Sequence, residues 1–467
     1  MKPAFAIIAA VMLGACAGPR PKIPMSASIT PPQAWRADTS AAGDISATWW
    51  QAFGDPVLTR LVDAALIDNI DIALAASRVT EARGQFYLAK ARTLPDVVAK
   101  VVGGRERDIN PGFGFPQSQD VVAGELAISY DLDLFGQLAR AGDAARAALL
   151  SSEASRDNVR LAIAAAAASG YITLCAFDAR LSVLRDTLVE RADSLKIARR
   201  LFEAGYSSQL DLAQAESDYR ATAQQIPAAQ LAIARQEDGL SILLGVNPRA
   251  IERGGDLNDL TLPSVPVILP AALLRRRPDI VAAEEQLVAA DRSLDSARAA
   301  FLPDVQLSAE GGLEASTLVP GSPQWVFSLG AGILAPVFDS GRLKAQQEVV
   351  AARRDQAAFA YRKAALTAFR EVEDALAAVQ RLDEQEDALV AQRDVLARTL
   401  TLATNRYRAG YSPYLDQLDA ERGLLFAKLA LVQSRADRLN ALVTLYQALG
   451  GGWAVNGATD GASRPAW

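Results

Sequence analysis

Histidine is absent from this sequence of 467 residues, and only two cysteines are present. Histidine is the commonest general base and metal ligand, and Cys16 and Cys175 lie too far apart in the sequence to suggest a metal cluster. No acid, base and nucleophile converge in a recognisable catalytic signature. We therefore expect a protein that is not an enzyme and needs no cofactor and no metal ion.

Aromatic residues are also scarce, at 6% of the chain, although half of its residues are hydrophobic and alanine supplies much of that share. This composition favours long, closely packed helices over a thick globular core. The formal net charge is -6, and lysine and arginine are interspersed with acidic residues. The sequence therefore has no basic stripe, and we do not expect nucleic acid as a partner.

The N-terminus has the pattern of a bacterial export signal. Lys2 precedes an apolar run over residues 5–13, which is too short to span a bilayer but is typical of a signal peptide. Residues 13–16 (LGAC) resemble a lipobox, which predicts a signal peptide over residues 1–15 and acylation of Cys16. The alternative is an ordinary signal peptide with an incidental cysteine. Ala17, in place of aspartate, fits delivery to the outer membrane by analogy with lipoprotein sorting.

Residues 16–46 are rich in proline, alanine and serine, and predict an extended tether after the lipidated cysteine. Three motifs then occur twice, in the same order and at nearly constant separation. LPDV occurs at 94–97 and 302–305, FGQL at 135–138 resembles SGRL at 340–343, and LFEAGYSSQLD at 201–211 resembles RYRAGYSPYLD at 406–416. The chain is therefore a duplicated structural unit.

Each repeat contains two segments with the alternation of a β-strand. We predict strands at about 96–107 and 121–135 in the first repeat and at about 304–314 and 324–336 in the second. Their length and single apolar face are typical of membrane-spanning strands, and Tyr130, Phe135, Trp325 and Phe327 lie where an aromatic belt would lie. A water-soluble sheet with one buried face is the alternative. Four strands cannot close a barrel, so strands in lipid require several chains to share one.

Long helical hairpins follow the strand pairs. The segments 137–204 and 341–408 contain no proline and are expected to be single helices. Each is followed by a glycine, Gly205 or Gly410, and a return helix, which Pro227 should kink or break in the first repeat only. We expect a first repeat over 47–250 with its hairpin at 137–245, a connector over 251–270, a second repeat over 271–450 with its hairpin at 339–449, and a tail over 451–467. Asp55-Pro56 and Arg277-Pro278 read as helix starts.

Several motifs resemble those of TolC/OprM-type outer-membrane efflux lipoproteins. They are WWQAFGDP at 49–56, RRRPDI at 275–280, RYRAG at 406–410 and LDQLDA at 415–420. The resemblance covers essentially everything after the tether. It implies a mainly helical fold with a membrane β-barrel, in which four strands from each chain of a homotrimer form one twelve-stranded barrel and the helical hairpins form a periplasmic α-barrel.

The function implied by this resemblance is that of the outer-membrane channel of a tripartite efflux system. The expected partners are a periplasmic adaptor protein, an inner-membrane RND-type transporter and outer-membrane lipid. Two alternatives remain, a type I protein-secretion duct and a non-transporting coiled-coil lipoprotein scaffold.

Candidate functional residues lie at the predicted closed end of the tunnel. Asp416 and Asp419 are three residues apart, on one face of a helix, so a three-fold axis would crowd six carboxylates together. By resemblance, Leu415 is the apolar gate position. The resemblance also makes Tyr407, Asp211 and Arg422 contacts that hold the gate shut. The alternative for all six is a solvated helix surface.

Overall fold

The computed structural model describes residues 19–36, 45–109, 114–264, 269–317, 321 and 323–453. Cys16, the signal peptide and residues 454–467 lie outside these ranges. The chain divides into two compact units. One comprises residues 1–29, 77–153 and 282–363, and the other comprises residues 30–76, 154–281 and 364–467.

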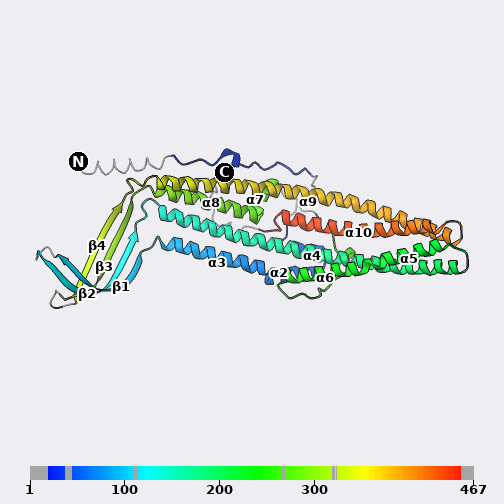
Figure 1. Ribbon diagram of the computed structural model, residues 1–467. Coiled ribbons are helices and arrows are strands. Elements are labelled where there is room, and N and C mark those ends of the chain that lie inside the picture. The colour runs from blue at the N-terminus through cyan, green and yellow to red at the C-terminus, as the bar shows by residue number, and fades with distance from the viewer. Residues whose placement is uncertain are drawn as a thin grey trace. The chain divides into compact units, whose positions relative to one another are not determined.

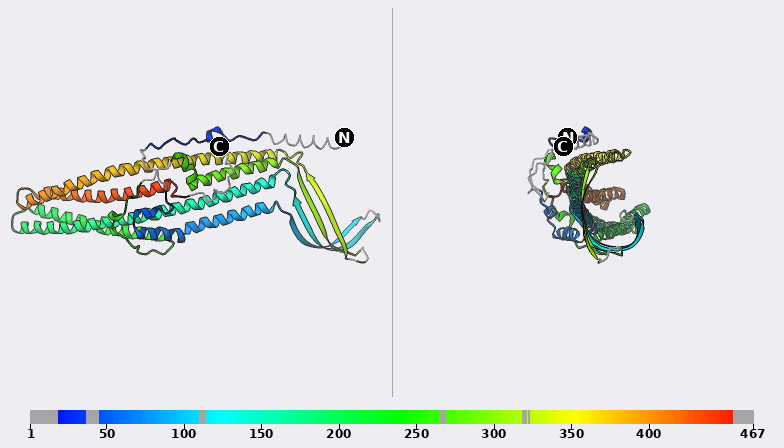
Figure 2. Two further views of the ribbon diagram at one scale, coloured as in Figure 1. Left: turned by 180° about the vertical axis from the view of Figure 1, so that it is seen from behind. Right: turned by 90° about the vertical axis from the view of Figure 1, so that its left-hand side faces the viewer.

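The first unit contains one four-stranded antiparallel sheet in the order β1-β2-β3-β4. Its strands are β1 (Asp96–Ile109), β2 (Pro116–Asp131), β3 (Asp304–Ser316) and β4 (Gln324–Leu334). The sheet is curved, and its two edges do not meet (Figure 2). One edge of β1 and one edge of β4 therefore have no neighbouring strand among the described residues.

The boundaries of β2 differ from the prediction of 121–135. The strand begins at Pro116 because it pairs with β1 as far as the Ile109–Pro116 position. It ends at Asp131, and the next residues turn through Gly136, whose φ of 73° places it in the left-handed region. Phe135 consequently lies in this turn rather than in the strand.

The register gives the sheet one apolar face. Residues opposite each other in an antiparallel sheet share a face, and this face carries rows such as Ala99, Leu126, Gly311 and Phe327. Tyr130 lies in a row toward one end, and Trp325 lies in a row toward the other. Further members of the face are Val97, Val101, Val122, Gly124, Ile128, Leu307, Ala309, Leu313, Leu329 and Ile333.

Charge marks one end of this apolar face. On β2 the face runs from Val122 to Tyr130, about nine residues, and a tilted strand needs roughly 9–11 residues to cross a bilayer. The next row toward the β1–β2 loop pairs Arg105 with Asp120 at 3.7 Å. The opposite face is polar, and there Lys100 Nζ lies 3.1 Å from both the Glu125 and the Glu310 carboxylates.

The helices are α2 (Pro56–Asp68), α3 (Ile70–Ala91), α4 (Gln137–Glu203), α5 (Gln209–Ala223), α6 (Gln225–Leu243), α7 (Pro270–Arg276), α8 (Pro278–Ala299), α9 (Arg342–Arg408) and α10 (Tyr414–Ala448). Figure 1 shows the return helices α5 and α10 joined to α4 and α9 by short turns. The mainly helical fold with four strands, predicted from the sequence, is confirmed. Among the described residues, α4 alone is long and apolar enough to cross a membrane by composition, and 56% of its apolar window is buried.

Prolines set several helix boundaries as predicted. Asp55 is the N-cap of α2 and Pro56 its first residue, and Pro278 begins α8. The first return helix is broken, because α5 ends at Ala223 and α6 begins at Gln225, two residues before Pro227. The second return helix, α10, is continuous over 35 residues.

The double-tryptophan motif lies in the core of the second unit. Trp49 is 1% exposed and stacks on Tyr446 of α10, with ring centroids 5.3 Å apart. The Asp55 carboxylate accepts hydrogen bonds from the backbone amides of Val57 (2.6 Å) and Leu58 (3.1 Å) and from the Tyr171 hydroxyl (2.8 Å). The motif therefore positions the start of α2 on α4 and α10.

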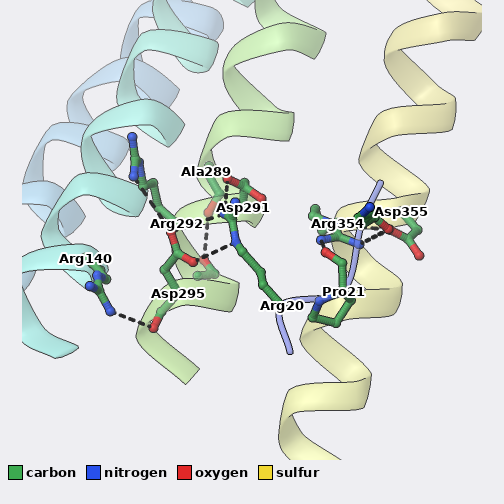
Figure 3. Close-up of polar contacts among 11 residues, drawn as sticks. Arg20, Pro21, Arg140, Ala289, Asp291, Arg292, Asp295, Arg354 and Asp355 are labelled. Atoms are coloured by element: carbon green, nitrogen blue, oxygen red, sulfur yellow. Dashed lines mark hydrogen bonds and ion pairs between the residues drawn. The ribbon is translucent and has the colours of Figure 1, made fainter. Parts of the chain in front are cut away.

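In the first unit, the described N-terminal segment that begins at residue 19 is bound to α8 and α9 (Figure 3). Arg20 forms ion pairs with Asp291 (2.6 Å) and Asp295 (3.1 Å) of α8. Arg354 of α9 is 1% exposed and donates to the carbonyls of Pro21 (2.6 Å) and Lys22 (3.1 Å). Residues 20–22 of the predicted tether are therefore held against α8 and α9 by partly buried polar contacts.

Candidate functional site

The two repeated glycine motifs form matching turns in the second unit. Gly205 and Gly410 both have a φ of 76°, and each donates its N–H to the carbonyl three residues before it, at 2.9 and 3.0 Å. The next residues are Tyr206 and Tyr411. The backbone N–H of each donates to the backbone carbonyl five residues before it, at 2.8 and 2.9 Å. These are left-handed helix C-terminal turns that favour glycine, which explains why the glycine recurs in both repeats.

The return helices start differently after these turns. Ser208 accepts a hydrogen bond from the Asp211 N–H (3.1 Å), and the Asp211 carboxylate accepts one from the Ser208 N–H (3.2 Å), which forms a capping box on α5. The N-cap of α10 is Pro413, which makes no side-chain cap. The structure therefore places Asp211 in a local cap.

The predicted gate residues Leu415, Asp416 and Asp419 share one exposed side of the first turns of α10. Leu415 is 47% exposed, whereas its neighbours Tyr414 and Leu418 are each 1% exposed. These three residues consequently lie on the surface of a single chain.

Tyr407 occupies a different environment from the predicted gate residues. Its side chain packs with Tyr414 (ring centroids 5.3 Å apart) in a hydrophobic cluster that includes Leu418, Ala198 and Ala215. Its hydroxyl is buried and has no hydrogen-bond partner among the described residues. Burial raises the pKa of Tyr407, and the negative charge of Asp211 raises it further. The structure brings Tyr407 and Asp211 near each other without a hydrogen bond between them.

Arg422 forms an ion pair that the sequence did not predict. Its Nε lies 3.0 Å from Oδ1 of Asp218 on α5, a residue that is 3% exposed. Asp218 also pairs with Arg191 of α4, which is 4% exposed and donates to the Asp218 carbonyl at 2.9 Å. One buried carboxylate thus joins α4, α5 and α10. The sequence indicates Asp218 only through its position, which is seven residues, or about two helical turns, after Asp211.

A second polar contact connects α10 to α4 close to this ion pair. Glu421 Oε1 accepts hydrogen bonds from Gln417 Nε2 (2.7 Å) and Ser194 Oγ (3.0 Å). Glu421, Gln417 and Ser194, which we call the Glu421 cluster, lie beside a cavity of about 250 Å³. The cavity is bordered by α4, α9 and α10, and its other lining residues include Glu190, Arg191, Asp193, Thr404, Arg408 and Lys428.

No group of three or more His, Cys, Asp or Glu residues in the described part of the chain could hold a metal ion. The polar groups near the turns instead form capping bonds, ion pairs and hydrogen bonds between helices. This arrangement can hold helices together or release them.

Comparison with known proteins identifies the family. The sequence matches the outer membrane efflux protein family over residues 61–246 and 269–451. It is 34% identical over 460 residues to the pyoverdine export outer membrane protein OpmQ of Pseudomonas putida, covering 95% of this chain and 96% of that protein. It is 33% identical over 466 residues to the toluene efflux pump outer membrane protein TtgC of Pseudomonas putida, covering 96% and 94% of the two chains.

Solved structures agree with the sequence comparison. The outer-membrane channel OprN has a TM-score of 0.85 with 27% identity, covering 93% of this chain and 99% of that chain. The open state of the Neisseria gonorrhoeae MtrE outer membrane channel has a TM-score of 0.81 with 29% identity, covering 93% and 98%. The protein therefore belongs to the outer membrane efflux protein family. It is an efflux channel of the outer membrane, as its sequence motifs predicted.

Proposed function

We propose that three copies of this chain form one channel, in which their twelve strands close a single barrel. The observation that carries this proposal is the four-stranded sheet with an apolar face and open edges at β1 and β4. Unpaired backbone groups cannot face lipid, so strands that cross a membrane must find neighbours in other copies. The long helices α4 and α9 are the elements from which the periplasmic part of the channel would be built.

The channel works as the outer-membrane part of a tripartite pump for small molecules and performs no catalysis. Its partners are a periplasmic adaptor protein and an inner-membrane RND-type transporter. The support is that relatives over nearly the whole chain are named as outer membrane proteins of a toluene efflux pump and of pyoverdine export. A lipid on Cys16 anchors the mature N-terminus to the outer membrane, supported by the LGAC motif.

The gate of this channel consists of Leu415, Asp416 and Asp419 from each copy. Their exposure on α10 supports this role, because residues of a gate must be free to meet their symmetric copies. Asp416 and Asp419 crowd around the axis when the tunnel is closed, and their repulsion is offset by bound cations and by contacts that hold α10. Arg422 supplies one such contact through Asp218, while Tyr407 and Asp211 hold the same region from α9 and α5.

Planar-bilayer recordings test the gate. The wild-type channel should conduct poorly, prefer cations and be blocked by multivalent cations added on the periplasmic side. The double variant Asp416→Ala/Asp419→Ala should lose most of that block and part of the cation preference, and Glu216→Gln, an exposed site on α5, serves as the control. Unchanged block and selectivity in the double variant would show that these carboxylates do not line the constriction.

A further inference from the structure

Glu421 is an unusual carboxylate because only one of its oxygens is hydrogen-bonded. Oε1 accepts from Gln417 and Ser194, both neutral donors, at 2.7 and 3.0 Å. Oε2 is buried and has no hydrogen-bond partner among the described residues. An ionised carboxylate with one buried and unsatisfied oxygen is costly, and this cost falls when the group binds a proton.

The charged groups around the Glu421 cluster come from four helices. Arg191 of α4 is engaged by Asp218 of α5, and Lys428 of α10 lies 3.7 Å from Glu190 of α4. No cation forms an ion pair with Glu421 within the described ranges of the chain. The other titratable groups that face or line the same region are Asp193 of α4, Arg408 of α9, and Tyr414 and Arg422 of α10.

These surroundings favour a proton over another cation as the species that neutralises Glu421. Arg191, Arg408 and Lys428 line the cavity beside Glu190, Asp193 and Glu421, so the lining has no excess of negative charge that would attract a metal ion or an organic cation. Burial raises the pKa of Glu421 and the charge of Asp218 adds to this, while Gln417, Ser194 and Arg191 partly oppose it.

We propose that the Glu421 cluster is an acid-tightened latch, in which protonation of Glu421 strengthens the contact of α10 with α4 and so holds the channel shut. The latch acts beside the Asp218 ion pair, and the three helices α4, α5 and α10 separate only when both contacts open. The inference rests on the proposed gate, because it assigns regulation to the helix that carries Asp416 and Asp419.

The direction of the pH effect follows from linkage. When α10 moves away from α4, Glu421 becomes hydrated and its pKa returns toward its ordinary value. The closed state, in which the pKa is raised, therefore binds the proton more tightly. The extra stability of the closed state is fully present below the ordinary pKa, and it is lost as pH rises through the raised pKa. A rise in periplasmic pH should loosen the latch and increase conductance.

The test must separate Glu421 from the gate carboxylates, whose ionisation also favours opening. We would record planar-bilayer conductance against periplasmic pH for Asp416→Asn/Asp419→Asn and for the same double variant carrying Glu421→Gln. Glutamine keeps the acceptor for Gln417 and Ser194 but stays neutral, as a permanently protonated mimic. The double variant should retain a rise of conductance with pH, and the triple variant should stay at the low, acidic level throughout.

Two outcomes would overturn the latch. One is a double variant whose conductance does not change with pH, and the other is a triple variant that retains the same rise as the double. Glu216→Gln in the double background is the matched control and should leave the pH profile unchanged.

Infrared spectroscopy gives a second readout. At a pH where exposed carboxylates are ionised, the wild-type protein should still show the band of a protonated carboxyl group, and this band should be absent in Glu421→Gln. Failure of the proposed function is distinguishable, because then the wild-type protein would not conduct at any pH.

Discussion

Asp55 satisfies donors from two different parts of the fold. Its carboxylate caps α2 by accepting hydrogen bonds from the N–H groups of Val57 and Leu58, and it also accepts a hydrogen bond from the Tyr171 hydroxyl on α4. The Tyr171 hydroxyl in turn accepts a hydrogen bond from the Gly254 N–H at 2.9 Å. A Cβ at Gly254 would lie 2.4 Å from an Asp55 oxygen, so this glycine is required by the close approach.

Asp55→Ala should destabilise the protein by about 2–4 kcal/mol, because a lost N-cap costs ~1 kcal/mol and a buried hydroxyl without its partner costs about 1–3 kcal/mol. The midpoint of denaturant unfolding, followed by circular dichroism in detergent, measures this loss. Asp55→Asn keeps a side-chain oxygen and should lose clearly less. Equal losses in the two variants would contradict the capping role.

Cys16 lies outside the described residues, and its acylation remains a prediction from the LGAC motif. Mass spectrometry of the mature wild-type protein should show a lipid-modified Cys16 at the N-terminus, and Cys16→Ser should lose the lipid. The variant should still reach the membrane, since a closed barrel anchors a protein more strongly than one lipid does. A mature N-terminus without acylation would leave the ordinary signal peptide as the correct interpretation.

Local residue patterns predicted helix starts and turns but missed the buried ion pair of Asp218. Asp55-Pro56, Pro278 and the two turn glycines are legible in the sequence because their effects act within a few residues. Asp218 was missed because its importance comes from Arg191 and Arg422, which lie 27 and 204 positions away. Helical spacing makes Asp211 and Asp218 equivalent candidates, and only the packing of α5 on α10 distinguishes them.

At the scale of elements, the sequence predicted the apolar face of strand β2 but not where the strand begins. Alternation predicted its apolar face, but its start at Pro116 depends on pairing with Ile109 across a loop. Alternation within one strand does not reveal where pairing begins, because the register is set between two strands. The break between α5 and α6, by contrast, follows from Pro227 alone and was predicted to within a few residues.

The two faces of β2 can be tested with neighbouring residues. Leu126 lies on the apolar face, in the row of Ala99 and Gly311, whereas Ala127 lies on the polar face opposite Glu310. Leu126→Lys should reduce the yield of assembled protein in the outer membrane strongly, because lysine facing the bilayer midplane costs about 2–4 kcal/mol per site. Ala127→Lys is the matched control and should assemble like the wild type. Normal assembly of Leu126→Lys would mean that this face does not contact lipid.

At the scale of the whole molecule, one chain is incomplete as a membrane structure. Its sheet has an apolar face of membrane-crossing length and two edges without neighbours among the described residues. This incompleteness could be read from the sequence, since four strands are too few to close a barrel. The number of copies could not, because strand count in the assembly depends on interfaces that a single chain does not contain.

Native mass spectrometry of the detergent-extracted wild-type protein tests the central claim, that several copies share one barrel, most directly. We predict a complex of three chains. No monomer should be present as long as enough detergent is bound to cover the membrane strands. A folded monomer with native helix content, or a complex of any other number of chains, would contradict the twelve-stranded barrel.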